Sequence, residues 1–288
     1  MKPPVFAYAA ADHLEQALEL KQQYGSDARF LAGGQSLVPA MNYRLVQPKV
    51  LIDINRVEGF AEIASKADET RVGALTRLAM IEGDASLAQS LPVLVDACRH
   101  VAHPQIRNRG TVGGNLCQAD PASELPAVLL ALDARVRARS LRGERWIALA
   151  DFHRGIYETA LDDSELVTEV AIPQPPADAR SCFLETARRR GDFAMMGVAV
   201  VLVSDGDRRC LSARIALCNA GPVPVLAKAG SSALVGEILS TQTIDAAARA
   251  VAAEIDPPGS LQASPEFQRH LAYVLTRRAL GNAAEVTA

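Results

Sequence analysis

Two glycine pairs, 80 positions apart, constrain the fold of this 288-residue chain more than any other feature of its sequence. The first pair lies in Ala32-Gly33-Gly34-Gln35-Ser36 and the second in Thr111-Val112-Gly113-Gly114-Asn115. Glycine lets the backbone adopt positive φ and approach a ligand closely, and consecutive N–H groups in such a turn form a concave anion site. The pairs therefore predict two turns that hold the two halves of a pyrophosphate. Taken singly, each pair is also compatible with an ordinary tight turn.

Neither glycine pair fits a common nucleotide-binding motif. The spacing differs from G-x-G-x-x-G and from G-x-x-x-x-G-K-[ST]. The sequence therefore argues against a Rossmann domain and against a P-loop nucleotidase. A dinucleotide ligand would have to be held in another way.

The composition is that of an ordinary globular protein of about two domains. Hydrophobic residues make up 49% of the chain, and the formal net charge of −3 indicates no nucleic-acid partner. No apolar run approaches the length of a membrane span. The absence of an apolar signal segment and of any C-x-x-C pair predicts a cytoplasmic protein. The five scattered cysteines also argue against an iron–sulfur or zinc site within this chain, so we expect no metal there.

The N-terminal part of the sequence alternates between strand and helix patterns. The predicted strands are Val5–Tyr8, Arg29–Ala32, Val50–Ile54, Ala61–Ser65, Arg71–Ala74, Arg135–Ala138 and Leu166–Ile172. The predicted helices are one capped by Asp12, one after Ser36, one capped by Thr76, Pro92–Val101, Glu124–Leu132 and Asp151–Thr159. Pro173-Gln174-Pro175-Pro176 is the best linker in the chain.

After the linker, the pattern changes to three strands followed by helices, which predicts an antiparallel sheet with helical cover. The predicted strands are Cys182–Arg188, Val198–Val203 and Ala213–Cys218. The predicted helices are Ser231–Leu239, Thr243–Ile255 and Pro265–Leu280.

Both glycine pairs extend into longer motifs that resemble one family. The first continues as Leu37-Val38-Pro39 and is followed by Leu51-Ile52-Asp53-Ile54; the second continues through Ala119-Asp120-Pro121-Ala122-Ser123-Glu124-Leu125-Pro126. With Arg188-Arg189-Arg190-Gly191-Asp192-Phe193-Ala194, they resemble the FAD-binding medium subunits of molybdenum hydroxylases, such as aerobic carbon monoxide dehydrogenases and xanthine dehydrogenases. The resemblance covers nearly the whole chain.

The resemblance implies an α+β fold in two parts. Residues 1–174 would form a p-cresol-methylhydroxylase-type FAD-binding domain, with lobes at about 1–56 and 57–174. Residues 177–288 would form a smaller α+β C-terminal domain with a three-stranded antiparallel sheet and helices. FAD would lie between the lobes and this C-terminal domain.

The resemblance also implies which residues contact FAD. Arg29, Phe30 and Leu31 would line the adenosine side, Glu124 would be an acidic contact, Leu166 an apolar one, and Asp192 and Phe193 would lie near the isoalloxazine ring. The residues implied to bind the pyrophosphate and nearby atoms are Ala32, Gly33, Gly34, Gln35, Ser36, Thr111, Val112, Gly113, Gly114 and Asn115. Many relatives carry a lysine shortly before the double arginine, where this chain has Leu184-Glu185-Thr186.

The function implied by the resemblance is electron transfer by an FAD-dependent oxidoreductase subunit. It would take electrons from iron–sulfur clusters of one partner subunit and pass them to an external acceptor. A second partner subunit would carry the molybdenum cofactor and hydroxylate the substrate, in an assembly expected to be a dimer of heterotrimers. No Ser/His/Asp or Cys/His set has interpretable spacing, so no catalytic residue is predicted in this chain. Two alternatives stay open: a stand-alone flavin oxidoreductase of the same fold, and a flavin-less assembly subunit.

Overall fold

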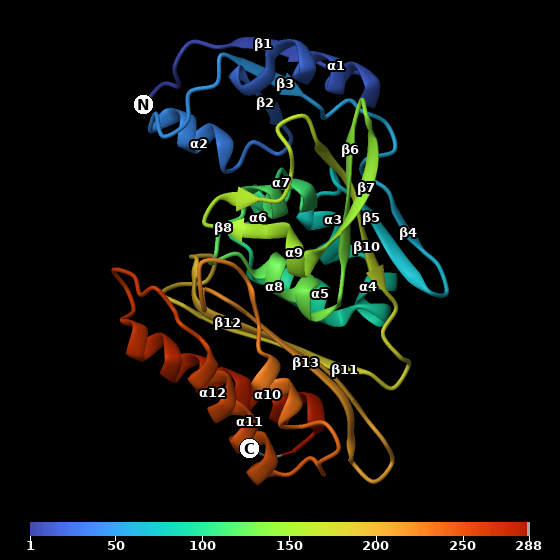
Figure 1. Cartoon of the computed structure of the whole chain (residues 1–288), viewed down its shortest axis with the longest axis vertical. Coiled ribbons are helices and arrows are strands. Elements are labelled where there is room, and N and C mark those ends of the chain that lie inside the picture. The colour runs from blue at the N-terminus through green and yellow to red at the C-terminus, as the bar shows by residue number, and fades with distance from the viewer. Residues whose placement is uncertain (287–288) are drawn as a thin grey trace.

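The N-terminal residues form a small parallel sheet with helix α1 packed on it (Figure 1). In the computed structural model, which describes residues 1–286, β1 (Ala7–Ala10), β2 (Ala28–Leu31) and β3 (Val50–Asp53) pair in the order β1-β3-β2. Helix α1 (Leu14–Tyr24) is capped by His13, whose Nδ1 accepts from the N–H of Gln16, and not by Asp12 as predicted. A 3₁₀ turn (η1, Gly25–Asp27) leads into β2, and α2 (Leu37–Asn42) lies between β2 and β3.

The middle of the chain forms a five-stranded antiparallel sheet packed on helices. Its strands are β4 (Ile63–Ser65), β5 (Glu69–Gly73), β10 (Leu166–Pro173), β6 (Arg135–Ser140) and β7 (Gly143–Ala148), in the order β4-β5-β10-β6-β7. Its helices are α3 (Leu78–Gly83), α4 (Ala85–Ser90), α5 (Pro92–His100), α6 (Pro104–Arg107), α7 (Val112–Gln118), α8 (Glu124–Ala131) and α9 (Leu149–Phe152). Every residue of α8 is buried, so this helix is the centre of the core.

The predicted helix Asp151–Thr159 is wrong. Helix α9 ends at Phe152, and a hairpin of β8 (His153–Gly155) and β9 (Glu158–Thr159) follows. Tyr157 at the hairpin tip has φ of 59°, which a helix cannot accommodate, and its N–H donates to the carbonyl oxygen of Ala119. Strand β7 was not among the predicted strands.

The C-terminal part is an antiparallel sheet between two layers of helices. Strands β11 (Arg180–Ala187), β12 (Ala194–Ser204) and β13 (Cys210–Cys218) match the three predicted strands, and a short fourth strand, β14 (Val225–Leu226), extends them. Figure 1 shows α10 (Lys228–Ser232), α11 (Thr241–Glu254) and α12 (Pro265–Ala284) on one side and α5 and α8 on the other. Strand β12 is buried along most of its length because helices cover both its faces.

The predicted helix Ser231–Leu239 is also wrong. Helix α10 ends at Ser232, and Gly236 in the following segment has φ of 87°, outside the helical region. The lobe boundary near residue 56 and the domain boundary at 174–177 stay predictions. Among residues 1–286, no helix is long and apolar enough to cross a membrane.

Candidate functional site

The first glycine pair connects β2 to α2, and its two glycines are required for different reasons. Gly34 has φ of 73°, a conformation that favours glycine. Gly33 packs directly against the backbone before the second motif: a Cβ at Gly33 would lie 2.9 Å from the carbonyl carbon of Arg109 and closer still to its oxygen. The first glycine motif therefore touches the chain two residues before Thr111, so the two motifs meet in space.

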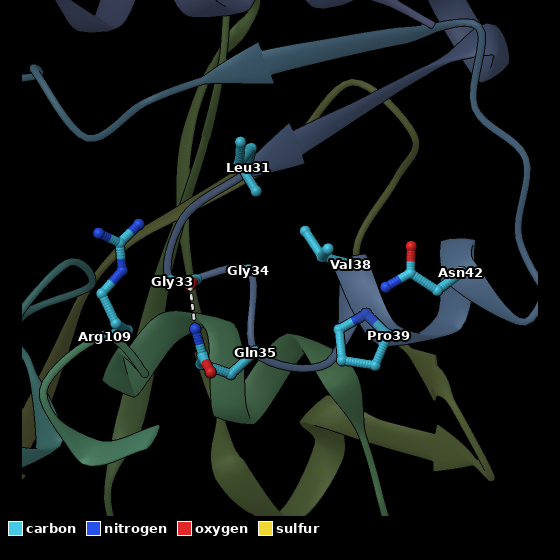
Figure 2. A pocket seen from close by; sticks show the side chains of 8 residues that line it. All are labelled: Leu31, Gly33, Gly34, Gln35, Val38, Pro39, Asn42 and Arg109. Atoms are coloured by element: carbon cyan, nitrogen blue, oxygen red, sulfur yellow. Dashed lines mark hydrogen bonds between the residues drawn. The ribbon is translucent and has the colours of Figure 1, made fainter. Parts of the chain in front are cut away.

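A cavity of about 320 Å³ lies over this junction (Figure 2). Its lining residues come from the first motif, helix α2 and the segment before α7: Leu31, Gly33, Gly34, Gln35, Val38, Pro39, Asn42 and Arg109. Four of the predicted site residues, Leu31, Gly33, Gly34 and Gln35, therefore line one cavity.

The first motif offers hydrogen-bond donors to this cavity. The N–H groups of Gly33, Gly34 and Gln35 have no acceptor within the described residues, whereas the Gln35 side chain donates 3.0 Å to the carbonyl oxygen of Gly33. Figure 2 shows Arg109 beside the same loop. No carboxylate in residues 1–286 pairs with the Arg109 guanidinium, so a positive charge accompanies these donors. Free amides and a cation are what an anion such as a phosphate requires.

The second motif is not the concave turn that the sequence predicts. Thr111 caps α7 by accepting 3.1 Å from the N–H of Gly114, and the N–H groups of Val112 and Gly113 donate to the carbonyl oxygens of Thr76 and Ala74. The N–H groups of Val112, Gly113 and Gly114 are therefore already hydrogen-bonded within the protein. Gly113 is needed because a Cβ there would lie 2.7 Å from the Cβ of Ala74, so the pair serves close packing instead of positive φ.

Two side chains fix the two motifs to each other. Asn55, which follows β3, donates from Nδ2 to the carbonyl oxygen of Ala32 at 2.9 Å. Arg77 donates from Nη2 to Oδ1 of Asn55 at 2.6 Å and from Nη1 to the carbonyl oxygen of Arg109. The first motif, the strand end and the second motif are thus held by one network. No local sequence pattern singles out Arg77, Asn55 or Arg109, and they were not predicted as site residues.

Glu124 lies beneath the second motif in a buried position. The preceding Ser123 donates 2.8 Å to Oδ1 of Asn115, which ties the start of α8 to α7. Glu124 is only 5% exposed, and burial, reinforced by the charges of Glu185 and Asp120, raises the pKa of its carboxyl group to about 8. This carboxyl group therefore holds a proton at neutral pH.

The remaining predicted contact residues do not line the cavity. Arg29 is exposed on β2, whereas Phe30 packs on the N-terminal core and Leu166 is buried in it. Asp192 and Phe193 follow Gly191, whose φ is 84° and whose missing Cβ leaves room for the ring of His103. Phe193 is 69% exposed. Contact of these residues with FAD stays a prediction.

No metal site accompanies the cavity. Within residues 1–286, no three His, Cys, Asp or Glu side chains are grouped so that they could hold a metal ion. All five cysteines are free thiols.

Comparison with known proteins identifies two matching family models. Residues 4–175 match the FAD binding domain in molybdopterin dehydrogenase, and residues 181–283 match the CO dehydrogenase flavoprotein C-terminal domain. The chain is 41% identical over 283 residues to the 6-hydroxypseudooxynicotine dehydrogenase complex subunit alpha of Paenarthrobacter nicotinovorans, covering 98% of this chain and 96% of that protein.

Two solved structures have the same fold as this chain over nearly its whole length. A chain of carbon monoxide dehydrogenase from Hydrogenophaga pseudoflava, in a form lacking the Mo-pyranopterin moiety of the molybdenum cofactor, has a TM-score of 0.95 at 34% identity. A chain of quinoline 2-oxidoreductase from Pseudomonas putida 86 has a TM-score of 0.94 at 35% identity. Both comparisons cover 99% of each chain.

Proposed function

This chain belongs to the FAD-binding medium subunits of the molybdenum hydroxylase family, and we propose that it transfers electrons within such a complex. The family assignment confirms the predicted oxidoreductase subunit with an FAD-binding domain followed by a C-terminal domain. Electrons would come from iron–sulfur clusters of a partner subunit and leave to an external acceptor. A molybdenum-cofactor subunit would hydroxylate the substrate.

The observation that carries the proposal is the junction of the two glycine motifs. Gly33 packs against the backbone of Arg109, and the cavity above this contact is lined by amides and an arginine for which residues 1–286 supply no acceptor and no carboxylate partner. A pyrophosphate carries negative charge and needs close backbone approach, so the residues present fit this part of FAD. Gly33, Gly34, Gln35 and Arg109 would hold the pyrophosphate, while Gly114 and Asn115 would approach neighbouring atoms.

FAD held by these residues would supply the electron-carrying chemistry of the subunit. The protein would bind it, orient it and control access to it. Phe193 would shield the ring from solvent because its side chain is exposed next to the Gly191 turn. Thr111–Asn115 and Asn55 would keep the binding loops in place when partners dock.

The assembly and location are part of the same proposal. The name of the Paenarthrobacter relative describes a subunit of a dehydrogenase complex, which supports partners for this chain. We propose a dimer of heterotrimers with an iron–sulfur subunit and a molybdenum subunit, in the cytoplasm. The domain boundaries near residues 56 and 174–177 would separate the lobes and the C-terminal domain that enclose FAD.

The test is to purify the chain, measure its FAD content and offer it candidate substrates without oxygen. Heterocycles, aldehydes and carbon monoxide should leave the flavin oxidised until an iron–sulfur subunit and a molybdenum subunit are restored. A chain purified without FAD that cannot be reloaded would support the flavin-less assembly subunit. Flavin reduction by any of these compounds at a catalytic rate, without partners, would establish the stand-alone enzyme instead.

A further inference from the structure

The loop of residues 188–193, which connects β11 to β12, carries Phe193 and must hold it in place if its ring is to cover the flavin. Phe193 is 69% exposed, so its own packing does not fix it. Arg189 and Arg190, earlier in the loop, line a second cavity of about 490 Å³ together with residues of α5 and β11. Packing is therefore incomplete there as well, and the loop depends on contacts close to Phe193.

Gly191 holds one side of Phe193 on the middle part of the chain. A Cβ at Gly191 would lie 2.6 Å from ring atoms of His103 and 2.7 Å from the carbonyl oxygen of Ala102. His103 directly precedes α6. The loop therefore packs closely against the backbone that leads into α6.

Asn219 holds the other side of Phe193. It directly follows β13, at the end of the sheet where β12 begins. Its Nδ2 donates to the carbonyl oxygen of Ala194 at 2.8 Å and to that of Met195 at 3.3 Å. Ala194 is the residue after Phe193 and is buried in a cluster with Ala127 of α8. The chain is therefore fixed immediately next to Phe193.

The backbone of Asn219 reaches from the C-terminal sheet to the second glycine motif. Its N–H donates to the carbonyl oxygen of Pro121 at 2.6 Å. Pro121 lies between α7, which contains the second glycine pair, and α8. Asn219 thus bonds the start of β12 through its side chain and the second motif through its backbone.

Asn219 makes these bonds from a left-handed backbone conformation, with φ of 57°. Two further non-glycine residues of this kind lie at the same place: Ala119 has φ of 50°, Tyr157 has φ of 59°, and the Tyr157 N–H donates 2.9 Å to the carbonyl oxygen of Ala119. Such conformations persist where the surrounding structure holds them, and they cluster at functional sites. Their meeting at residues 119–121, directly after the second motif, indicates a functional constraint there.

Gln268 of α12 completes the hydrogen bonding of Asn219. Its side chain is fully buried, and its Nε2 donates to the carbonyl oxygens of Met195 at 3.1 Å and Asn219 at 3.3 Å. Its Oε1 accepts from the N–H of Gly259 at 2.9 Å. The N–H, the carbonyl oxygen and the side chain of Asn219 are therefore all bonded, so this residue cannot move without breaking them.

We propose that Asn219 is a positioning residue of the flavin site, which holds Phe193 at a fixed place relative to the second glycine motif. The inference rests on the proposed function, in which Phe193 covers the flavin ring. Asn219 acts through Phe193, because its side chain bonds the residue next to Phe193 and its backbone bonds the segment after the motif.

Substitutions separate the side chain of Asn219 from its backbone. Asn219→Gly removes the side-chain donor but keeps the positive φ and the N–H that bonds Pro121. Asn219→Asp keeps the size but turns an acceptor toward two carbonyl oxygens. Arg208→Gly is the matched control: Arg208 has φ of 62°, and its side chain donates 2.8 Å to the carbonyl oxygen of Leu239 at the other end of the sheet.

The first experiment follows hydrogen exchange of the cofactor-free chain by mass spectrometry. The amides of residues 189–196 should exchange about tenfold faster in Asn219→Gly and Asn219→Asp, because the loss of two hydrogen bonds shifts a local opening equilibrium by about that factor. Arg208→Gly should leave this segment unchanged. Exchange at the unmodified rate in both Asn219 variants would overturn the proposal.

The second experiment tests whether Asn219 acts through Phe193. In FAD-loaded chains, Asn219→Gly should shift the flavin absorbance and fluorescence in the same direction as Phe193→Ala, and the double variant should show no further shift. A shift of equal size with and without Phe193 would overturn the proposal, as would no shift in Asn219→Gly. A chain that takes up no FAD would refute the proposed function, and hydrogen exchange would still decide whether Asn219 holds the loop.

Discussion

Arg77 donates from Nη2 to Oδ1 of Asn55 across 2.6 Å, and this bond joins the two glycine motifs. Asn55 bonds the carbonyl oxygen of Ala32 on one side, and Arg77 bonds that of Arg109 on the other. Burial and the charge of Arg109, in that order, lower the pKa of Arg77. The distance between the motifs is therefore set by side chains that need not contact a ligand.

Replacing Arg77 should weaken FAD binding more than it weakens the fold. Loss of hydrogen bonds made by a charged group costs about 1.5–3 kcal/mol, so Arg77→Ala should lower FAD affinity roughly 10- to 100-fold. Arg77→Lys should recover only part of this, because one ammonium group cannot span both acceptors. Titration of the chain with FAD, followed by flavin fluorescence, measures the effect. Arg142→Ala, at an exposed arginine, is the control, and equal affinities would refute the positioning role.

Alanine substitution of the two glycines of the first motif should reduce FAD binding to different extents. Gly33→Ala would push the backbone of Arg109 away from the first motif. Gly34→Ala would strain a backbone whose φ is 73°, at a cost of about 1 kcal/mol, but its new Cβ would meet only side chains, which move more easily than backbone. FAD content after purification should therefore fall further for Gly33→Ala. Gly206→Ala, where a Cβ meets nothing within 4 Å, should retain FAD. The reverse order of Gly33→Ala and Gly34→Ala would show that φ, not close approach, controls the site.

The sequence alone marks the two glycine pairs as positions where the backbone is constrained, because glycine is the one residue that lacks a Cβ. It could not predict what each glycine does: Gly113 avoids Ala74, whereas Gly34 adopts positive φ, and both occur as Gly-Gly. Arg77 and Asn55 are 22 residues apart, and Arg77 and Arg109 are 32 apart, so their bonds leave no periodic pattern.

The strands and helices also divide into those that the sequence could predict and those that it could not. Strand β12 could be predicted because Val198–Val203 is a continuous apolar run. The hairpin of β8 and β9 could not, because its turn depends on a bond from Tyr157 to the distant Ala119. Tertiary contacts of this kind override local helix preference.

Glu124 should make the stability of the cofactor-free chain fall as pH rises. Burial is the main cause that raises its pKa from 4.5 to about 8. Below pH 4.5 both folded and unfolded chains hold the proton, but between 4.5 and 8 only the folded chain does. The free energy of unfolding therefore loses up to about 1.4 kcal/mol per pH unit from this group across that window. Urea unfolding at pH 5 and pH 8 should show that the free energy of unfolding of Glu124→Gln increases relative to that of the unmodified chain as pH rises. A difference between the two chains that stays constant with pH would contradict the raised pKa of Glu124.

Phe193 should affect flavin chemistry without affecting the fold. Its side chain is 69% exposed, so Phe193→Ala removes little buried apolar surface and should change the free energy of unfolding by no more than about 0.5 kcal/mol. If the ring covers FAD, the variant should shift the flavin absorbance spectrum and react faster with oxygen after reduction. Leu211→Ala, at a side chain that is 53% exposed on β13, is the matched control, because neither cavity includes it. An unchanged spectrum together with unchanged reoxidation would place Phe193 away from the cofactor, and its exposure would then point to a contact with a partner subunit.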